Sequence, residues 1–390
     1  MNLELVLALV IFVVVGVPSI FLALQYLFGL RSSFGRDDSE GSRNPCVVLI
    51  PAHNESSIIA DTLTSLKSQL QIDDRIVIVA DNCSDNTADI GRDFGFEVLE
   101  RSSDTERGKG YALDFGLQHI AKSPAATVVI FDADCEFLEG SLDVLVRASQ
   151  RRMRVVQSLY LMKAPKNAPL KIRLAEFAWK VKNQIRPEGQ KMLGLSCQLQ
   201  GAGMAFPWTI ITAQSLASGS IVEDLELGLK LSERGEMVDY LPLAGVDSYF
   251  PMSDEALETQ RTRWEHGHLA SIKELIPRFL GALVKGRLRA GLMMLDAMIP
   301  PTVLWLMIST LNICVAFVLF LFGYSLLFTL NFVPYLLMVF SLVLVWWIHG
   351  RSLVSGKDLF GVLSFILKKI TLYKKISKTK EKKWVKTDRG

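Results

Sequence analysis

Three long apolar segments constrain the fold of this chain most. They run from Leu3 to Leu30, from Met298 to Phe328 and from Phe332 to Ile348. A helix that crosses the hydrocarbon core of a bilayer needs about 20 apolar residues, with a lower limit near 17. We therefore expect three membrane spans and one large, more polar part between the first and the second.

Basic residues flank the three segments on one side only. They are Arg31 and Arg36 after the first, Lys285, Arg287 and Arg289 before the second, and Arg351 and Lys357 after the third. Because basic flanks stay in the cytoplasm, we predict a multi-pass protein of the inner or plasma membrane with a cytoplasmic middle part. The alternative for the first segment is a signal peptide. It is less favoured, because the apolar stretch is long and no Lys or Arg precedes it.

Two further stretches, Ser271 to Ala290 and Leu359 to Ile376, mix apolar and basic residues. This pattern predicts helices that lie on an anionic membrane surface, with a packed helix and a solvated tail as the alternative. The predicted boundaries are 1–30 for the anchor, 31–268 for the cytoplasmic domain, 269–297 for interfacial helices, 298–349 for two spans and 350–390 for an interfacial helix and basic tail.

Charge and cysteine content exclude two classes of function. The net charge is only +3, so no broad basic face is available and we expect no nucleic-acid partner. The five cysteines form no CxxC pair, which argues against a disulfide framework and against a zinc site. Three histidines, His53, His266 and His268, also lack the spacing of a zinc site.

The middle part has the pattern of an α/β domain. Three short apolar runs, Cys46 to Ile50, Arg75 to Ala80 and Thr127 to Phe131, are rich in β-branched residues, as are strands buried on both faces of a parallel sheet. Helical patterns follow the first two runs, and Asn54 is available to cap the first helix. In such sheets ligands bind at the carboxyl ends of the strands.

Acidic residues stand at those strand ends. Asp81 follows the second run, and Asp132 and Asp134 follow the third as "DAD". Two carboxylates in this spacing can hold a hard divalent cation, whereas a solvated loop or a helix cap is the ordinary alternative. Their place after a buried strand favours the metal. No GxxxxGK[ST] loop is present, which disfavours hydrolysis of the P-loop type.

Further polar groups follow along the chain. Lys109 lies in "RGKGYAL", a turn suited to diphosphate contact, and Glu223 and Asp224 open a predicted helix, where acids often serve only the helix dipole. Gln260 to Trp264, "QRTRW", adds cations and an aromatic ring. Together these groups offer what displacement at a sugar carbon requires, namely a metal for the diphosphate, a base for the acceptor and a cation for the leaving group.

In this order the residues resemble a known family. Asp81, Asp132-Ala133-Asp134, Glu223-Asp224 and the Gln260 to Trp264 stretch resemble the D, DxD, [ET]D and QxxRW series of membrane-bound glycosyltransferase family 2, which includes cellulose, hyaluronan, chitin and poly-N-acetylglucosamine synthases. The likeness extends from about Pro45 to Leu269. It implies an α/β fold of the GT-A type with one N-terminal and two C-terminal transmembrane helices plus interfacial helices.

The resemblance also implies a role for each position in the donor site. Pro51, Ala52 and Glu55, in the "PAHNE" loop, would hold the nucleotide base and ribose together with Asp81. Lys109 would lie near the base or the diphosphate. Asp132 and Asp134 would lie beside the diphosphate, with Asp134 as the principal ligand of Mg²⁺ or Mn²⁺.

Acceptor chemistry is implied at the other motifs. Asp224 would be the base that activates the acceptor hydroxyl. Gln260, Arg263 and Trp264 would border the acceptor end of the donor site, with Arg263 on the diphosphate and Trp264 under the acceptor sugar. Such a site performs an inverting single displacement and needs no separate nucleophile.

We therefore predict a metal-dependent glycosyltransferase that moves a sugar from a nucleotide-sugar donor to a lipid-linked or polysaccharide acceptor at the membrane. A UDP-sugar is the expected donor. Exopolysaccharide or cell-surface glycan synthesis is the expected setting. Three spans are fewer than large polymer synthases carry, so addition of one sugar to a lipid acceptor and dependence on export partner subunits both stay open. The alternative from another class is a non-catalytic subunit that binds sugar nucleotides, and a nucleotidyltransferase is a weaker one.

Overall fold

The computed structural model describes residues 3–31, 41–358 and 361. The chain divides into two compact units, and each is described by itself. Among the described residues, the sheet unit comprises 41–165 and 196–267, and the helical unit comprises 3–31, 166–195, 268–358 and 361. The expected α/β part and the expected apolar helices thus form separate units.

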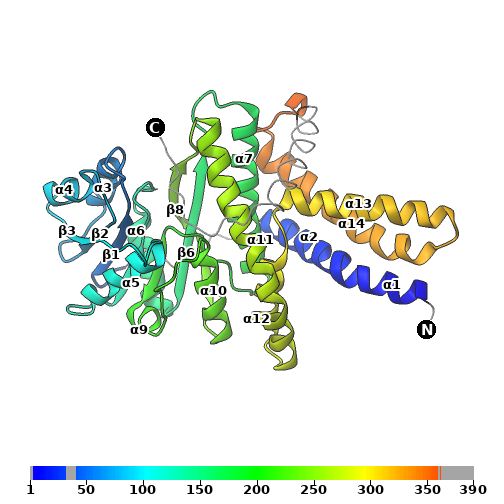
Figure 1. The fold of residues 1–390 in the computed structure, drawn as a ribbon, viewed down its shortest axis with the longest axis horizontal. Coiled ribbons are helices and arrows are strands. Elements are labelled where there is room, and N and C mark those ends of the chain that lie inside the picture. Colours follow the sequence, from blue (N-terminus) through cyan, green and yellow to red (C-terminus); the bar gives the residue numbers. More distant parts are fainter. Residues whose placement is uncertain (1–2, 32–40, 359–360, 362–390) are drawn as a thin grey trace. The chain divides into compact units, whose positions relative to one another are not determined.

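The sheet unit is built on one sheet of eight strands in the order β3-β2-β1-β4-β7-β6-β8-β5. Figure 1 labels β1, β2, β3, β6 and β8 of this sheet. The strands are β1 (Cys46–Ala52), β2 (Arg75–Asp81), β3 (Glu97–Arg101), β4 (Thr127–Ile130), β5 (Glu136–Phe137), β6 (Val155–Lys163), β7 (Met204–Pro207) and β8 (Val238–Tyr249). The three strands predicted from the sequence are β1, β2 and β4. They pair in parallel with β1 in the centre, which confirms the predicted parallel core.

The other half of the sheet is mixed. β7 runs antiparallel to both of its neighbours, β4 and β6, and β8 pairs in parallel with β6 over most of its length. The short strand β5, directly after the "DAD" triplet, pairs antiparallel with β8. This pairing connects the acidic loop to β8, near one edge of the sheet. The sequence pattern did not indicate this connection.

Helices cover both faces of the sheet. They are α3 (Ile59–Lys67), α4 (Thr87–Asp93), α5 (Lys109–Ile120), α6 (Ser141–Arg152), α9 (Trp208–Ile211) and α10 (Glu223–Glu233). Two glycines allow close approach: a side chain at Gly116 of α5 would collide with Leu49 and Val79, and one at Gly91 of α4 would collide with Ile78. Because neighbouring residues of a strand point to opposite faces, α4 and α5 pack on opposite sides of β2.

The turn before α3 differs from the prediction. α3 begins at Ile59, and Asn54 does not cap it. Instead Asn54 has a left-handed backbone, with φ at 55°, and its side-chain oxygen accepts a 2.7 Å hydrogen bond from the backbone N–H of Ser84. Asn tolerates this conformation because its short amide bonds locally. Its amide therefore joins two loops rather than starting a helix.

The helical unit contains the apolar segments. Its members are α1 (Leu3–Ile11), the π-helical turn η1 (Phe12–Gly16), α2 (Val17–Gly29), α7 (Leu170–Lys180), η3 (Val181–Ile185), α8 (Arg186–Met192), α12 (Leu288–Met298), α13 (Thr302–Leu321), α14 (Ser325–Val345), η4 (Trp346–Gly350) and η5 (Gly356–Asp358). Three helical stretches, Glu4–Gly29, Thr302–Leu321 and Ser325–Gly350, are long and apolar enough to cross a membrane, as predicted. Gly323, with φ at 94°, lies in the turn that ends the second of them before Phe328.

Small residues let α2 pack closely against η3 and α8. A side chain at Gly29 would collide with the carbonyl of Ile185, and one at Gly189 would collide with the carbonyl of Gln25. Glycines at a helix crossing are a common way to bring two backbones together in membrane proteins. The segment Lys166–Leu195 therefore belongs to the helical unit, although it lies within the predicted 31–268 domain.

One long helix, α11 (Asp254–Val284), contains both the "QRTRW" motif and most of the predicted interfacial stretch. The boundary expected at residue 268 falls inside this helix. Its last turns expose Ile276, Leu280 and Val284, and the turn before α12 carries Lys285 and Arg287. The second predicted interfacial stretch, Leu359 to Ile376, lies outside the described residues apart from Gly361.

Candidate active site

The loops that follow β1 and β2 are bonded to each other. The backbone N–H of Glu55 donates to Thr87 Oγ1 at 2.8 Å, and His53 Nδ1 lies 2.6 Å from the carbonyl oxygen of Asp81. Pro51 and Ala52 form the end of β1. The predicted base and ribose site, made of the "PAHNE" loop and Asp81, thus comes together at the carboxyl ends of two neighbouring parallel strands.

Asp81 is buried at the end of β2 and is paired with a cation that the sequence analysis missed. Arg101 Nη1 lies 2.8 Å from Asp81 Oδ1, and the Arg101 guanidinium also lies 5.6 Å from the ring centre of Tyr111. β3 runs parallel to β2 and brings Arg101 opposite Asp81 in register. Only this register could have revealed the pair, because 20 residues separate the two side chains.

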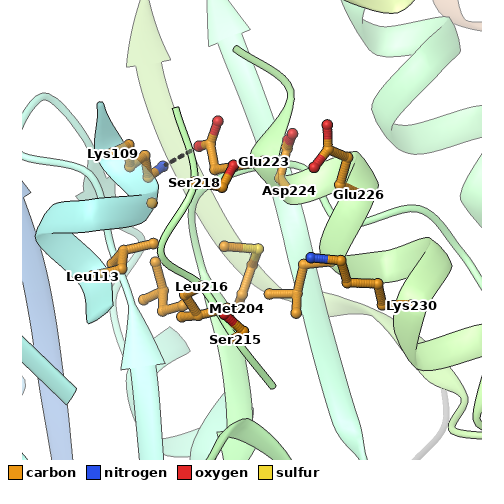
Figure 2. A pocket seen from close by; sticks show the side chains of 13 residues that line it. Lys109, Leu113, Met204, Ser215, Leu216, Ser218, Glu223, Asp224, Glu226 and Lys230 are labelled. Carbon is orange, nitrogen blue, oxygen red and sulfur yellow. Dashed lines mark ion pairs between the residues drawn. The ribbon is translucent and has the colours of Figure 1, made fainter. Parts of the chain in front are cut away.

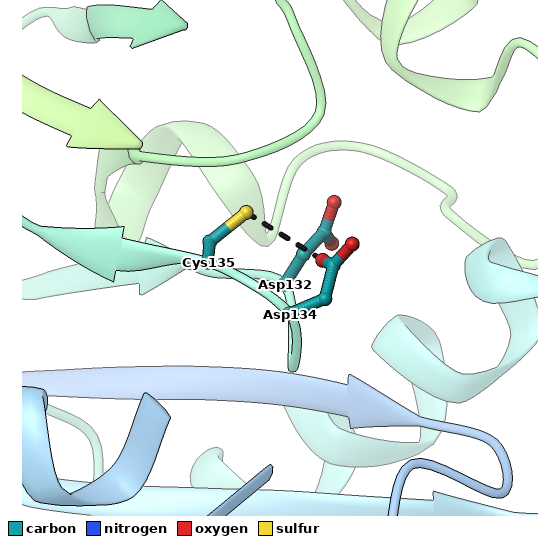
Figure 3. A group of neighbouring side chains, drawn as sticks. All are labelled: Asp132, Asp134 and Cys135. Carbon is teal, nitrogen blue, oxygen red and sulfur yellow. Dashed lines mark hydrogen bonds between the residues drawn. The ribbon is translucent and has the colours of Figure 1, made fainter. Parts of the chain in front are cut away.

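The "DAD" triplet forms a tight turn directly after β4. The backbone N–H of Cys135 donates to the Asp132 carbonyl at 3.3 Å, and Thr62 Oγ1 donates to the Ala133 carbonyl at 2.8 Å, which fixes the turn against α3. Asp132 and Asp134 point to the same side, as Figure 3 shows. Ligand atoms of Asp132, Asp134 and Cys135 all lie within 4.8 Å of one another.

This set of donors fits a hard divalent cation. The two carboxylates supply oxygen ligands of the kind that Mg²⁺ and Mn²⁺ prefer. Burial holds the pKa of the Cys135 thiol well above its ordinary value, so the thiol stays protonated and donates to Asp134 Oδ1 at 3.5 Å. Cys135 therefore orients Asp134 and does not act as a soft thiolate ligand.

Lys109, the first residue of α5, reaches across to the acids. Its Nζ contacts Asp132 Oδ1 and donates to the Gly201 carbonyl at 3.0 Å. The Nζ also lies 3.8 Å from Glu223 Oε1, the ion pair drawn in Figure 2. Burial acts to lower the pKa of Lys109, but the carboxylates around it raise that pKa above its ordinary value. The Lys109 side chain thus stays protonated and carries a permanent positive charge among acidic groups.

Two glycines, one in α5 and one in the loop before β7, make this meeting possible. A side chain at Gly110 would lie 2.5 Å from the Leu216 carbonyl, so α5 and the loop before α10 touch only because Gly110 has none. Gly201 has φ at 95°, and a side chain there would reach to 3.6 Å from Asp224 Oδ2. The sequence alone did not indicate that the Gly201 carbonyl accepts a hydrogen bond from Lys109.

Glu223 and Asp224 form the first turn of α10, as predicted. Burial raises the pKa of Glu223 to about 7, with the Lys109 ammonium acting against the rise and the Asp224 carboxylate adding to it. A small pocket runs beneath these acids between α5 and α10, lined on one side by Leu113 and Met204 (Figure 2). Glu223 therefore belongs to the site, although the sequence analysis gave it no role of its own.

The "QRTRW" side chains lie in the first half of α11. Gln260, Arg263 and Trp264 are spaced to share one helix face. Burial lowers the pKa of Arg263, while Glu223 and Asp132 act electrostatically to raise it, so its charge is felt at both acids. Gln260 is fully buried, and among the described residues neither its amide nitrogen nor its amide oxygen has a hydrogen-bond partner.

A further glycine brings α11 close to α10. A side chain at Gly267 would lie 2.8 Å from Val222 Cγ1, and Val222 directly precedes Glu223. The motif helix and the acidic helix thus touch at the start of α10. Arg261 forms a long i,i+4 ion pair with Glu265 at 3.9 Å, which explains it as a helix-stabilising residue.

Known proteins share this architecture. PcManGT, a mannosyltransferase from Pyrobaculum calidifontis solved in complex with GDP-Man and Mn²⁺, superposes with a TM-score of 0.53 at 15% identity, over 86% of this chain and 98% of that chain. At this identity the likeness shows the fold alone, and it supports the predicted GT-A type.

Sequence relatives carry names of the expected kind. The Bacillus subtilis (strain 168) protein named Probable glycosyltransferase YdaM is 26% identical over 247 residues, which are 60% of this chain and 57% of YdaM. The poly-beta-1,6-N-acetyl-D-glucosamine synthase of Staphylococcus aureus (strain COL) is 26% identical over 301 residues, 74% of this chain and 68% of the synthase. The matched region is thus little more than half of the first relative and about two thirds of the second.

The family model described as glycosyltransferase like family 2 matches residues 44–267. This range covers more than half of the chain. It includes β1 to β8 and ends in α11 just after the "QRTRW" stretch, so the sheet, the acidic turn and the motif helix all lie inside it. The chain belongs to glycosyltransferase family 2.

Proposed function

We propose that this chain is an inverting, metal-dependent glycosyltransferase that uses a nucleotide-diphosphate sugar. One observation carries the proposal: charged groups from three distant segments meet at one point. They are Asp132 after β4, Lys109 at the start of α5 and the Glu223 and Asp224 pair at the start of α10. A structural ion pair needs one acid and one base, whereas this cluster collects acids around a single ammonium.

The residues divide the chemistry between them. Asp132 and Asp134 would hold Mg²⁺ or Mn²⁺, which neutralises charge on the diphosphate as it leaves. Lys109 and Arg263 supply further positive charge on the same side. Asp224 takes the proton of the acceptor hydroxyl, and its first-turn position keeps the carboxylate at the edge of the pocket.

The fully buried amide of Gln260 supports an acceptor role for the motif helix. A buried amide without a partner costs about 1–3 kcal/mol, a penalty that an acceptor hydroxyl would remove. Among the described residues none serves this amide. Gln260, Arg263 and Trp264 would therefore line the acceptor end of the site, with the indole ring under a sugar.

Membrane location supports an acceptor held at the bilayer. Three helices are apolar enough to span it, and the last turns of α11 expose apolar residues next to the basic turn at Lys285 and Arg287. This mixture is typical of a helix at an anionic interface. The basic flanks favour a multi-pass arrangement with the sheet unit in the cytoplasm. Cysteines introduced at Gly323 and Lys357 test this, because only the first should react with an impermeant thiol reagent in intact cells.

The relatives suggest what to offer the protein. A poly-N-acetylglucosamine synthase among them favours a UDP-sugar and a polysaccharide product, while the mannosyltransferase with GDP-Man shows that GDP-sugars fit the same fold. The setting we propose is exopolysaccharide or cell-surface glycan synthesis. Addition of one sugar to a lipid acceptor is the shorter version of the same chemistry.

The test is a donor panel. Purified full-length protein in lipid nanodiscs is incubated with UDP- and GDP-sugars, Mn²⁺ or Mg²⁺, and a membrane extract as acceptor, and released nucleoside diphosphate is measured together with product length. We expect one donor to be turned over, and Asp224→Asn to abolish the release. Donor binding without turnover of any sugar would instead support a non-catalytic binding subunit.

A further inference from the structure

The ammonium of Lys109 lies where a bound cation would meet the first acid of the triplet. It contacts Asp132 Oδ1, and Asp132 is one of the two carboxylates that fit a divalent cation. A divalent cation on Asp132 and the ammonium on the same carboxyl group would repel each other strongly at this short range. The two therefore compete for the charge of Asp132.

A second carboxylate is already in place for the ammonium. Glu223 Oε1 lies 3.8 Å from Lys109 Nζ, and the Gly201 carbonyl accepts a hydrogen bond from it at 3.0 Å. A lysine ammonium sits on a flexible stem with rotatable donors, so it can turn from one acid to the other without moving the backbone. Glu223 therefore offers Lys109 a place to go.

We propose that Lys109 is a built-in counter-ion that exchanges partners during donor binding. Without donor, its ammonium neutralises Asp132. When the cation and the nucleotide diphosphate bind, Lys109 leaves Asp132 for Glu223 and the diphosphate. Glu223 is thus a positioning residue for Lys109. This inference rests on the proposed metal-dependent function and adds the order in which positive charges occupy the site.

The exchange of partners by Lys109 affects how the acidic cluster binds a divalent cation. An acid cluster without counter-ion would bind free cations in the absence of donor, and it would suffer from repulsion among its own carboxylates. Lys109 removes the repulsion and makes the cation compete for Asp132. Tight cation binding is then expected only together with the diphosphate, which supplies new partners for the displaced ammonium.

The experiment measures Mn²⁺ binding to nucleotide-free, full-length protein in nanodiscs, from the electron paramagnetic resonance signal of unbound Mn²⁺. Lys109→Met removes the competing charge at nearly constant length, and we expect Mn²⁺ affinity to rise about tenfold or more. Lys109→Arg keeps the charge and should bind Mn²⁺ as the wild type does. Lys122→Met, at an exposed position just beyond α5, is the matched control and should change nothing.

Affinity for UDP at saturating Mn²⁺ should move the other way. Lys109→Met is expected to weaken it, because the diphosphate loses the incoming ammonium. Tighter Mn²⁺ binding with weaker UDP binding in one variant is not expected of a purely structural lysine. Unchanged or weaker Mn²⁺ binding in Lys109→Met would overturn the exchange.

Glu223→Gln in the wild-type background provides a second test. It remains available if Lys109→Met does not fold. It should weaken Mn²⁺ binding in the wild-type background, because Lys109 then has one acid fewer to move to. In the Lys109→Met background the same substitution should reduce the Mn²⁺ affinity much less, because Glu223 then has no lysine ammonium to bind. Equal losses in both backgrounds would mean that Glu223 acts on the cation directly, and the positioning role would be lost.

Asp134→Ala separates failure of this inference from failure of the proposed function. In the Lys109→Met background it should abolish the gained Mn²⁺ affinity, which assigns the gain to the acidic turn. Mn²⁺ binding that depends on Asp134 but ignores Lys109 would refute the exchange and leave the metal site standing. No Mn²⁺ binding in any variant would remove the proposed metal dependence together with the exchange.

Discussion

Two charge clusters of this molecule are built in opposite ways. In the sheet unit, one ammonium, Lys109, meets Asp132 and Glu223, and these side chains keep 18–26% of their surface exposed. In the helical unit, Arg186 meets a single acid, Asp296, at 2.6 Å, and their side chains are only 8% and 3% exposed. The first cluster is open and has more acids than bases, whereas the second is closed and balanced.

Hydrogen bonds complete the second cluster. Gln25 of α2 donates to Asp296 Oδ1 at 2.6 Å and accepts from Arg186 Nε at 3.0 Å, so three helices are joined by one network. A buried pair is stable only when its remaining polar groups are satisfied in this manner. The difference teaches where to look for chemistry: the balanced cluster pairs its charges with each other, while the unbalanced one has excess acid that can accept a cation and substrate.

Asp224→Asn breaks the unbalanced cluster at the carboxylate assigned to the reaction. We expect transfer to fall by about 10³-fold, because the amide cannot take the acceptor proton. Binding of UDP and Mn²⁺ should change little, and the melting temperature should stay near that of the wild type, since a repelling charge is removed. Nucleoside diphosphate release and calorimetry measure these effects. Retained turnover would exclude Asp224 as the base.

Asp296→Leu breaks the balanced cluster, and its effect should fall on stability. Arg186 would remain buried without its acid, which costs about 3 kcal/mol or more. The melting temperature in nanodiscs should drop clearly. The double variant Arg186→Met with Asp296→Leu should recover much of the loss, because neither charge is then stranded. A double variant no more stable than the single one would mean that the network does more than pair charges.

The two clusters also differ in how far they could be predicted from the sequence. The acids at strand ends stand out because a buried apolar run directly precedes Asp81 and Asp132, and strand ends are where parallel sheets bind ligands. The parallel core and the three apolar helices follow from local composition in the same way. The order of the motifs then indicated the family.

Contacts between distant residues could not be read in this way. Arg186 and Asp296 lie 110 residues apart, and Arg186 stands in a stretch with many lysines that resembles a solvated helix. The mixed half of the sheet was missed because the antiparallel pairing of β7 between β4 and β6 depends on tertiary packing. The same reason hid the Gly201 carbonyl and the pairing of Lys109 with Glu223.

His268 is a buried titratable residue of the helical unit, and its protonation would place an unpaired positive charge there. Burial lowers its pKa to about 4, with the Lys182 ammonium adding to the shift, and its Nε2 lies 2.7 Å from the Ala297 carbonyl. The unfolded chain titrates near 6.5, so the neutral histidine contributes stability above that pH and loses it as pH falls towards 4. At pH 5 the loss should reach about 2 kcal/mol.

The measurement is the melting temperature at pH 7.5 and pH 5. His268→Gln keeps a donor for the carbonyl but does not titrate, so it should lose less stability on acidification than the wild type. His119→Gln, at a half-buried position of the sheet unit where the imidazole lies 3.0 Å from Glu97 Oε2, serves as a control for histidine replacement outside the helical unit. An equal acid loss in wild type and His268→Gln would show that other groups cause it.

Trp264→Ala probes the open cluster at its edge and should have the smallest effect. Trp264 shares a face of α11 with Arg263, whose charge reaches Glu223 and Asp132, but the indole itself carries no charge to unbalance. If the ring stacks under the acceptor sugar, its loss should raise the acceptor KM or lower kcat by about tenfold, with donor affinity little changed. Trp264→Phe retains an aromatic face and should recover part of the effect. A loss confined to donor binding would instead assign Trp264 to the nucleotide side, and the division of the site into a charged donor half and an aromatic acceptor half would have to be redrawn.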